Sequence, residues 1–193
     1  MSRICQSVLV DRNGRRMGEV ATLAADLKHG HFIREHAHPE DQLLFAARGV
    51  MTVRMGDDVW VVPPMCAVWI PAATTHSVAV SGELSMRTLY FWPGVCGALP
   101  ETCAVIHVSA LLRELVLRAC EYPRLRRRVE AERHLLDVIV DQLSVSEEVP
   151  LQLSQPTDAR AVRIAEAVAK DPADGRSLER LCRDCGASKR TIQ

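Results

Sequence analysis

The feature that most constrains the fold of this chain is a change of sequence periodicity close to residue 100. From Gly18 to about Trp92, short runs of β-branched and aromatic residues alternate with turn residues. Met51–Met55 and Val59–Val62 flank a "GDD" turn, a pattern typical of a β-hairpin. Strands this short and this evenly spaced indicate a β-sandwich or a small barrel. The first half of the chain is therefore expected to be mainly β.

Beyond residue 100 the apolar residues recur at helical spacing. We expect helices over 108–122 and 125–145, with Pro123 between them because proline interrupts a helix. A polar stretch typical of a linker follows. Thr157 is placed to cap a third helix, with Asp158 favourable at its positive end. The second half of the chain is therefore expected to be helical.

The charge balance excludes an overall attraction to nucleic acid or to anionic membranes. The 193 residues include 24 Lys+Arg and 24 Asp+Glu, so any such binding has to come from a local patch. No run approaches the roughly 20 apolar residues that span a bilayer, and the short N-terminal apolar run does not resemble a secretory signal. Seven cysteines without regular spacing suit a reducing compartment. We expect a cytoplasmic protein without membrane association.

The last segment has the pattern of a helix-turn-helix. Ser177 can cap a short helix, and Gly186 stands where that helix would end in a left-handed residue. The apolar face of the short helix comprises Leu178, Leu181, Cys182 and Cys185. Because both cysteines lie on this face and no second pair completes a zinc site, we expect them to be structural. Ser188 can cap a second helix that begins "KRTIQ".

The second helix of this motif would carry the DNA contacts. We expect phosphate contacts from Lys189 and Arg190 and base contacts from Thr191 and Gln193, with Ser188 at the helix start. A recognition helix normally has about two or three turns, and little more than one turn follows Ser188. We therefore expect the DNA-reading part to continue beyond Gln193, so that this chain alone binds DNA weakly or not at all.

A second candidate site is the polar stretch "HAHPEDQ" at residues 36–42. Residues two apart on a strand point to the same face, so the imidazoles of His36 and His38 can both enter the interior of a β fold. His76 from a later strand and the amide oxygen of Gln42 could complete a ligand set. Imidazole suits Zn, Ni, Cu or Fe, although a set without a carboxylate leaves the charge of the cation uncompensated. Three interpretations stay open: a metal site, a polar pocket for an organic effector, and histidines that satisfy one another.

A basic run follows Pro123: Arg124, Arg126, Arg127 and Arg128. It could contact phosphate. Pairing with Glu130 and Glu132 on a solvated helix face is the favoured interpretation.

The histidine stretch resembles a known motif. Residues 30–49 fit G-x5-H-x-H-x3-Q-x6-G, which is similar to the first motif of cupins, with Gln42 where many metal-binding cupins have glutamate. Pro71–His76 is similar to the second motif, P-x-G-x-x-H. It departs from that motif in Ala73 for the usual glycine, in Met65 for an earlier glycine and in Val80 for the closing asparagine.

A cupin barrel, a helical connector and the C-terminal pattern together resemble the AraC/XylS family of bacterial transcription regulators, over nearly the whole chain. The resemblance implies a jelly-roll-like cupin sensor at 1–98, a helical connector and dimerisation segment at 99–150, and the first helix-turn-helix of a DNA-binding domain at 151–193. It implies a homodimer that binds promoter DNA through a complete C-terminal domain and responds to a metal or small-molecule effector. A metal-dependent cupin enzyme, a dioxygenase or isomerase, is the alternative. Because the sequence offers metal-like ligands but no clear general base, we expect no enzyme activity.

Overall fold

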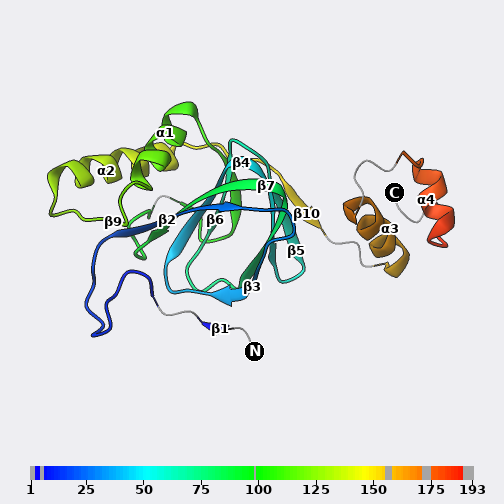
Figure 1. Ribbon diagram of the computed structural model, residues 1–193, viewed down its shortest axis with the longest axis horizontal. Helices are drawn as coiled ribbons and strands as arrows, with labels where there is room; N and C mark the ends of the chain where they lie inside the picture. Colours follow the sequence, from blue (N-terminus) through cyan, green and yellow to red (C-terminus); the bar gives the residue numbers. More distant parts are fainter. Residues whose placement is uncertain (1–2, 5–6, 98, 155–157, 171–174, 189–193) are drawn as a thin grey trace. The chain divides into compact units, whose positions relative to one another are not determined.

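The computed structural model describes residues 3–4, 7–97, 99–154, 158–170 and 175–188, and the chain divides into two compact units, Met1–Leu153 and Ser154–Gln193. Figure 1 shows the course of the chain. The strands are β1 (Arg3–Ile4), β2 (Val20–Leu27), β3 (Phe32–Ala37), β4 (Asp41–Met55), β5 (Asp58–Val62), β6 (Cys66–Ile70), β7 (His76–Phe91), β8 (Ala104–His107), β9 (Arg124–Leu125) and β10 (Gln152–Ser154). The helices are α1 (Ala110–Ala119), α2 (Glu130–Ser144), α3 (Ala159–Lys170) and α4 (Leu178–Asp184).

Strands β4 and β7 organise the first unit because each takes part in two layers of sheet. The start of β4 and the end of β7 pair with each other, β7 pairs there with β2, and β4 pairs with β6, which is followed by β8. The end of β4 and the start of β7 also pair with each other, and they are flanked by β5 and β3. The expected hairpin is confirmed as β4–β5, with Met51 opposite Val62.

The strand path runs from β1 to β10 without closing on itself. The mainly β, jelly-roll-like fold is therefore confirmed, but as an open two-layer sheet and not as a closed barrel. The pairing of β4 with β7 shifts on both sides of Arg48, where β4 passes from one layer to the other. At the neighbouring Gly49 the φ angle is +84°, and a Cβ atom would lie 2.0 Å from the Glu83 carbonyl oxygen. Only glycine allows this approach.

Alternate residues of β4 contribute to two different cores, as the pleat of a strand requires. Leu44 and Ala46 belong to an inner core, which lies between the two layers and also contains residues of β5, β6 and β7. Leu43 and Phe45 belong to an outer core that α1 and α2 cover. The two helices lie side by side against the strands (Figure 1). The first unit is thus a sandwich with an added helical layer.

Both helices of the connector are shorter than expected. Helix α1 begins only after Ser109, whose side chain accepts a hydrogen bond from the backbone amide of Leu112 at 3.1 Å. Helix α2 begins at Glu130, because Arg124 and Leu125 pair with β2 as a short strand, β9. The expectation of a helix from residue 125 was wrong because backbone pairing with a distant strand outweighs the local helical pattern.

The second unit contains α3 and α4, which pack through Ile164, Leu181 and Cys182. Ser177 caps α4 by accepting a hydrogen bond from the Arg180 amide, and Gly186 has a φ of 69°, so both expected signals are confirmed. Cys182 lies in this small core, with Cys185 packed against it. The proposed cap Thr157 lies outside the described residues. No helix of the described segments is long and apolar enough to cross a bilayer.

Candidate functional site

The fold brings the three histidines of the cupin-like motifs together. His36 of β3 is the register partner of His76 at the start of β7, and His38 lies in the turn between β3 and β4. The ring centroids of His36 and His76 are 4.3 Å apart, and the His38 ring lies 5.2 Å from that of His76. One ring nitrogen from each residue lies within 4.8 Å of the other two. These three residues form the histidine cluster.

Each ring of the histidine cluster is oriented by a backbone carbonyl two residues away. The Nδ1 atom of His36 lies 2.8 Å from the Arg34 carbonyl oxygen. The Nδ1 atom of His38 lies 2.9 Å from the Glu40 carbonyl oxygen, and that of His76 lies 2.9 Å from the Thr74 carbonyl oxygen. Because a carbonyl oxygen only accepts, each Nδ1 carries the proton. In a neutral ring the lone pair is then on Nε2, which is the tautomer required for a metal ligand at that atom.

His76 remains neutral at physiological pH. Its pKa is lowered to about 4, mainly by burial and also by the nearby His36 and His38, while the hydrogen bond to Thr74 opposes the shift. Its Nε2 atom is buried and has no hydrogen-bond partner among the described residues. A buried lone pair without a donor is costly, so this atom marks a position where a cation or a donor belongs.

Gln42 presents its amide oxygen to the histidine cluster. The Thr88 hydroxyl has one proton, which it donates to the Leu43 carbonyl at 3.0 Å, so it accepts from the Gln42 amide nitrogen, also at 3.0 Å. The Gln42 oxygen therefore faces His38 Nε2, at 3.1 Å. Two acceptors face each other here unless a proton or a cation lies between them. Ligands on a metal with bonds of about 2.1 Å are themselves about 3 to 3.5 Å apart, so this pair has the required spacing.

Glu40 places a buried carboxyl group beside the histidine cluster. Its side chain is only 1% exposed, and one carboxylate oxygen accepts hydrogen bonds from the Ser7 hydroxyl and the Leu9 amide. The other oxygen has no hydrogen-bond partner among the described residues and lies 3.9 Å from His38 Nδ1. If the histidine cluster holds a cation, a carboxylate at this distance would offset part of the cation's charge.

Sequence reasoning did not assign roles to Glu40, Thr88 or Tyr90. The Tyr90 ring meets the His38 ring edge-on at 5.1 Å. Thr88 is a polar residue at an inward position of a strand, and that position was the available signal. For Glu40 the sequence could not fix the direction of the chain after Pro39.

The second motif is degenerate in sequence but intact in backbone conformation. Met65 and Ala73, the two residues that replace motif glycines, are the non-glycine residues with positive φ in the described segments, at 63° and 62°. The turn that presents His76 is held by the Ala73 amide, which donates to the His38 carbonyl at 2.8 Å, and by Asp41, which accepts from the Ala72 amide at 2.9 Å. The glycine-type geometry has therefore survived the loss of glycine.

The expected DNA-contacting residues are mostly not covered by the structure. Ser188 follows the turn after α4, and Lys189, Arg190, Thr191 and Gln193 lie outside the described residues. Their role stays a prediction.

Comparison with known proteins identifies the family. Residues 20–153 match the family model described as the AraC-like ligand binding domain. The chain belongs to this family. Among relatives, this AraC-like domain is similar to the HTH-type transcriptional regulator NimR of Escherichia coli (strain K12), at 30% identity over 143 residues. The match covers 74% of this chain and 52% of NimR, so the chain spans about half the length of that relative.

Two similar solved structures differ in how much of this chain they match. ToxT of Vibrio cholerae with a bound unsaturated fatty acid is 9% identical, with a TM-score of 0.49 over 90% of this chain and 71% of that one. A cupin superfamily protein of Desulfitobacterium hafniense is 19% identical, with a TM-score of 0.37 over 38% of this chain and 67% of that one. At these scores the assignment to the AraC-like family rests on the sequence match.

Proposed function

We propose that this chain is the sensing part of a transcription regulator and that its effector is a divalent transition metal. The ligands are Nε2 of His36, His38 and His76 and the amide oxygen of Gln42. The observation that carries the metal assignment is the buried Nε2 atom of His76, which has no partner among the described residues and lies within a cluster of imidazoles. A metal supplies what this lone pair and the facing acceptors of His38 and Gln42 lack.

The donor set suits a borderline metal. Three imidazoles and one amide oxygen favour Zn, Ni or Fe over Mg or Ca, which prefer all-oxygen sites. The buried Glu40 carboxylate offsets part of the charge from behind His38. A bound ion would connect β3, the following turn and β7 and stabilise their arrangement. The chain itself orients the rings through the three backbone carbonyls.

An organic effector beside the histidine cluster is less well supported. The inner core between the two layers consists of apolar side chains that are at most 8% exposed, among them Ile70, Val78 and Met86. An effector there would have to displace close-packed side chains. The enzyme alternative is less well supported, because the carboxylate of Glu40 approaches His38 at Nδ1 and not at Nε2, and so is not placed to act as a base on the ligand side.

The regulatory role follows from the family and from the second unit. The AraC-like match and the name of the relative NimR, an HTH-type transcriptional regulator, support a regulator. The short helix α4 and the left-handed Gly186 after it support a helix-turn-helix that would bind promoter DNA. Exposed Leu111 on α1 and Val138 on α2 would contribute to a homodimer.

The first test is the metal content of untagged protein, measured by mass spectrometry. We expect near-stoichiometric Zn, Ni or Fe in the wild type and in His134→Ala, an exposed histidine of α2 that serves as the control. The metal should be lost in His36→Ala and in His76→Ala. A wild type that is free of metal and takes up none of the three added ions would overturn the metal assignment.

The second test concerns regulation. The codon for His76 is changed to alanine in the host gene, and transcripts are compared with and without added metal. We expect a set of transcripts to lose its metal response in the variant. Metal-dependent transcript profiles that are identical in the two strains would contradict a metal-sensing regulator, even if the protein binds metal.

A further inference from the structure

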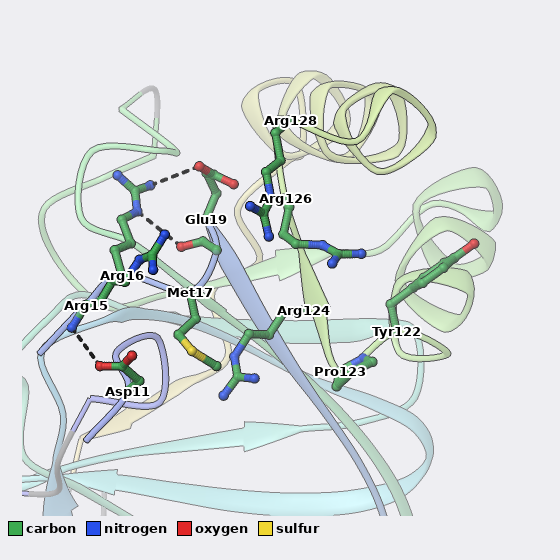
Figure 2. A pocket seen from close by; sticks show the side chains of 11 residues that line it. Asp11, Arg15, Arg16, Met17, Glu19, Tyr122, Pro123, Arg124, Arg126 and Arg128 are labelled. Atoms are coloured by element: carbon green, nitrogen blue, oxygen red, sulfur yellow. Dashed lines mark hydrogen bonds and ion pairs between the residues drawn. The ribbon is translucent and has the colours of Figure 1, made fainter. Parts of the chain in front are cut away.

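A second polar site lies outside the two-layer sheet, where the loop before β2 meets the segment between α1 and α2. A hollow of about 580 Å³ opens there (Figure 2). Its lining residues are Asp11, Arg15, Arg16, Met17, Gly18, Glu19, Tyr122, Pro123, Arg124, Arg126 and Arg128. We call it the arginine pocket. Five arginines face two carboxylates in this lining, so the pocket carries a positive excess in a chain without net charge.

The two segments that form the arginine pocket are joined by backbone contacts. The Glu19 amide donates to the Leu125 carbonyl at 3.0 Å, next to the pairing of β2 with β9. A Cβ atom on Gly18 would lie 2.9 Å from the same carbonyl oxygen, so the absence of a side chain permits the approach. The walls of the pocket are therefore fixed by the main chain, although they are about a hundred residues apart in the sequence.

Two of the arginines are already engaged. Arg126 forms a two-pronged ion pair with Glu132 of α2, which also accepts from the Arg126 backbone amide at 2.7 Å. The Arg16 guanidinium donates to the Gly18 carbonyl, pairs with Glu19 and stacks over Trp92, 4.7 Å from the ring centroid. These two groups build the walls and are not the best candidates for binding a ligand.

The other three arginines have unused donors. Arg124 has a buried Nε atom without a hydrogen-bond partner in the described part of the chain. One of its terminal nitrogens donates a long hydrogen bond, of 3.4 Å, to the Val8 carbonyl. Within the described segments the guanidinium groups of Arg15 and Arg128 have no hydrogen bond or ion pair. Figure 2 shows Arg124 and Arg128 extending from the connector toward the loop that carries Met17.

The two carboxylates of the lining do not neutralise these donors. Asp11 accepts from the backbone amides of Asn13 and Arg15 and thereby closes its own turn. Glu19 accepts from the Arg127 amide at 2.7 Å and pairs with Arg16. Both acids are used within the walls, so the buried donor of Arg124 has no negative partner among the residues that the structure describes.

We infer that the arginine pocket binds a small organic anion with at least two negative charges, carried by phosphate or carboxylate groups. The planar guanidinium forks of Arg124 and Arg128 suit both groups, which they bind in a bidentate manner. Met17 and Pro123 offer apolar contacts to the rest of the molecule. The volume is within the range of small-molecule sites, about 300 to 1,000 Å³, and a hollow favours a small ligand over the rod-like backbone of DNA. This site is independent of the metal proposed for the histidine cluster.

The test is calorimetric titration of the 193-residue chain with inorganic pyrophosphate and with citrate at low ionic strength, where charge interactions are least screened. We expect saturable binding of at least one probe by the wild type and by His76→Ala. The double variant Arg124→Gln/Arg128→Gln should bind at least about tenfold more weakly, since two charge-assisted hydrogen-bonding groups are lost. Arg124→Lys, which keeps the charge but not the fork, should also bind more weakly than the wild type.

The matched control is Arg54→Gln, an exposed arginine of β4 outside the pocket. It should bind like the wild type, and the arginine variants should keep the wild-type unfolding temperature within a few degrees. Absence of saturable binding to both probes would overturn the inference, as would an equal loss in Arg54→Gln. A duplex oligonucleotide is titrated in parallel. If it binds through Arg124 and Arg128 while neither small probe does, the pocket is a polyanion contact and the inference is wrong.

Discussion

The histidine cluster and the arginine pocket are both polar sites built at strand ends, but they are assembled in opposite ways. In the histidine cluster each ring is held by a carbonyl two residues away, and one ring nitrogen of each histidine lies within 4.8 Å of the other two. In the arginine pocket the side chains come from two segments about a hundred residues apart, and the charges are partly paired by Glu19 and Glu132.

This difference explains which site a sequence reveals. When a side chain is oriented by its own neighbours, local spacing can predict its direction. The strand argument applies to His36 of β3, whereas His38 lies in the turn after that strand. When two distant segments meet through a backbone contact, such as that of Glu19 with Leu125, the spacing of residues in the sequence does not predict that their side chains lie together. Because the two sites share no residue, we also expect that a substitution in one site leaves ligand binding at the other unchanged.

Removal of the metal should give the largest effect. If a chelator strips the wild type, the free energy of unfolding should fall by about 3 to 4 kcal/mol relative to protein with the metal at 100 to 1,000 times its dissociation constant. Denaturant unfolding with and without the chelator measures this change. His76→Ala should show no chelator effect, and Arg124→Gln/Arg128→Gln should show the full effect. A chelator effect that is reduced in the arginine variant would refute the independence of the sites.

Loss of the Thr88 hydroxyl should weaken metal binding without removing a ligand. In Thr88→Val the Gln42 amide loses the acceptor that fixes its orientation, so we expect about 10- to 100-fold lower metal affinity, as for other residues that orient a metal ligand through a hydrogen bond. Competition with a chromophoric chelator measures the affinity. Thr52→Val, on the same sheet but away from the cluster, is the control and should bind as the wild type does.

Glu132 should matter for stability in a pH-dependent way. Hydrogen bonding from Arg126 holds the pKa of this carboxyl below its ordinary value of 4.5. Because the pKa is lower in the folded protein than in the unfolded chain, the ionised carboxylate stabilises the fold above about pH 4.5. This stabilisation is lost as the pH falls through the pKa of the folded state. At pH 7 we expect Glu132→Gln to be about 1 to 2 kcal/mol less stable, since a charge-assisted hydrogen bond is lost.

The difference in the free energy of unfolding between wild type and Glu132→Gln should shrink on acidification toward pH 3. Urea unfolding at several pH values measures it. The same substitution frees the Arg126 guanidinium, so pyrophosphate should bind the variant several-fold more tightly. A difference in stability that grows toward low pH would contradict this account.

Ala73→Gly should have the smallest effect and the opposite sign. Ala73 is exposed and has a φ of 62°, a conformation that glycine adopts without strain. Relief of strain exceeds the added entropy of the unfolded chain, so we expect a gain of about 0.5 to 1 kcal/mol. Thermal unfolding measures it. Ala72→Gly, beside it but without positive φ, should be destabilising, and a gain in that variant would show that strain is not the cause.

The sequence by itself determined the mainly β first half, the β4–β5 hairpin, the cap at Ser177 and the left-handed Gly186, and it predicted His36, His38, Gln42 and His76 as one candidate ligand set. These features depend on local periodicity, on caps and on motif spacing, which act over a few residues. The sequence also has Met65 and Ala73 at positions where the motif has glycine. Both residues have the positive φ angle that is expected at a glycine position.

Only the tertiary structure decided the rest. The open path of the strands depends on where β4 crosses between layers, and the strand at Arg124–Leu125 depends on pairing with β2. The position of Glu40 behind His38 depends on the chain from Ser7 to Leu9 that covers it. In each case the deciding contact joins residues distant in sequence, and its free energy exceeds the local preference that the sequence displays.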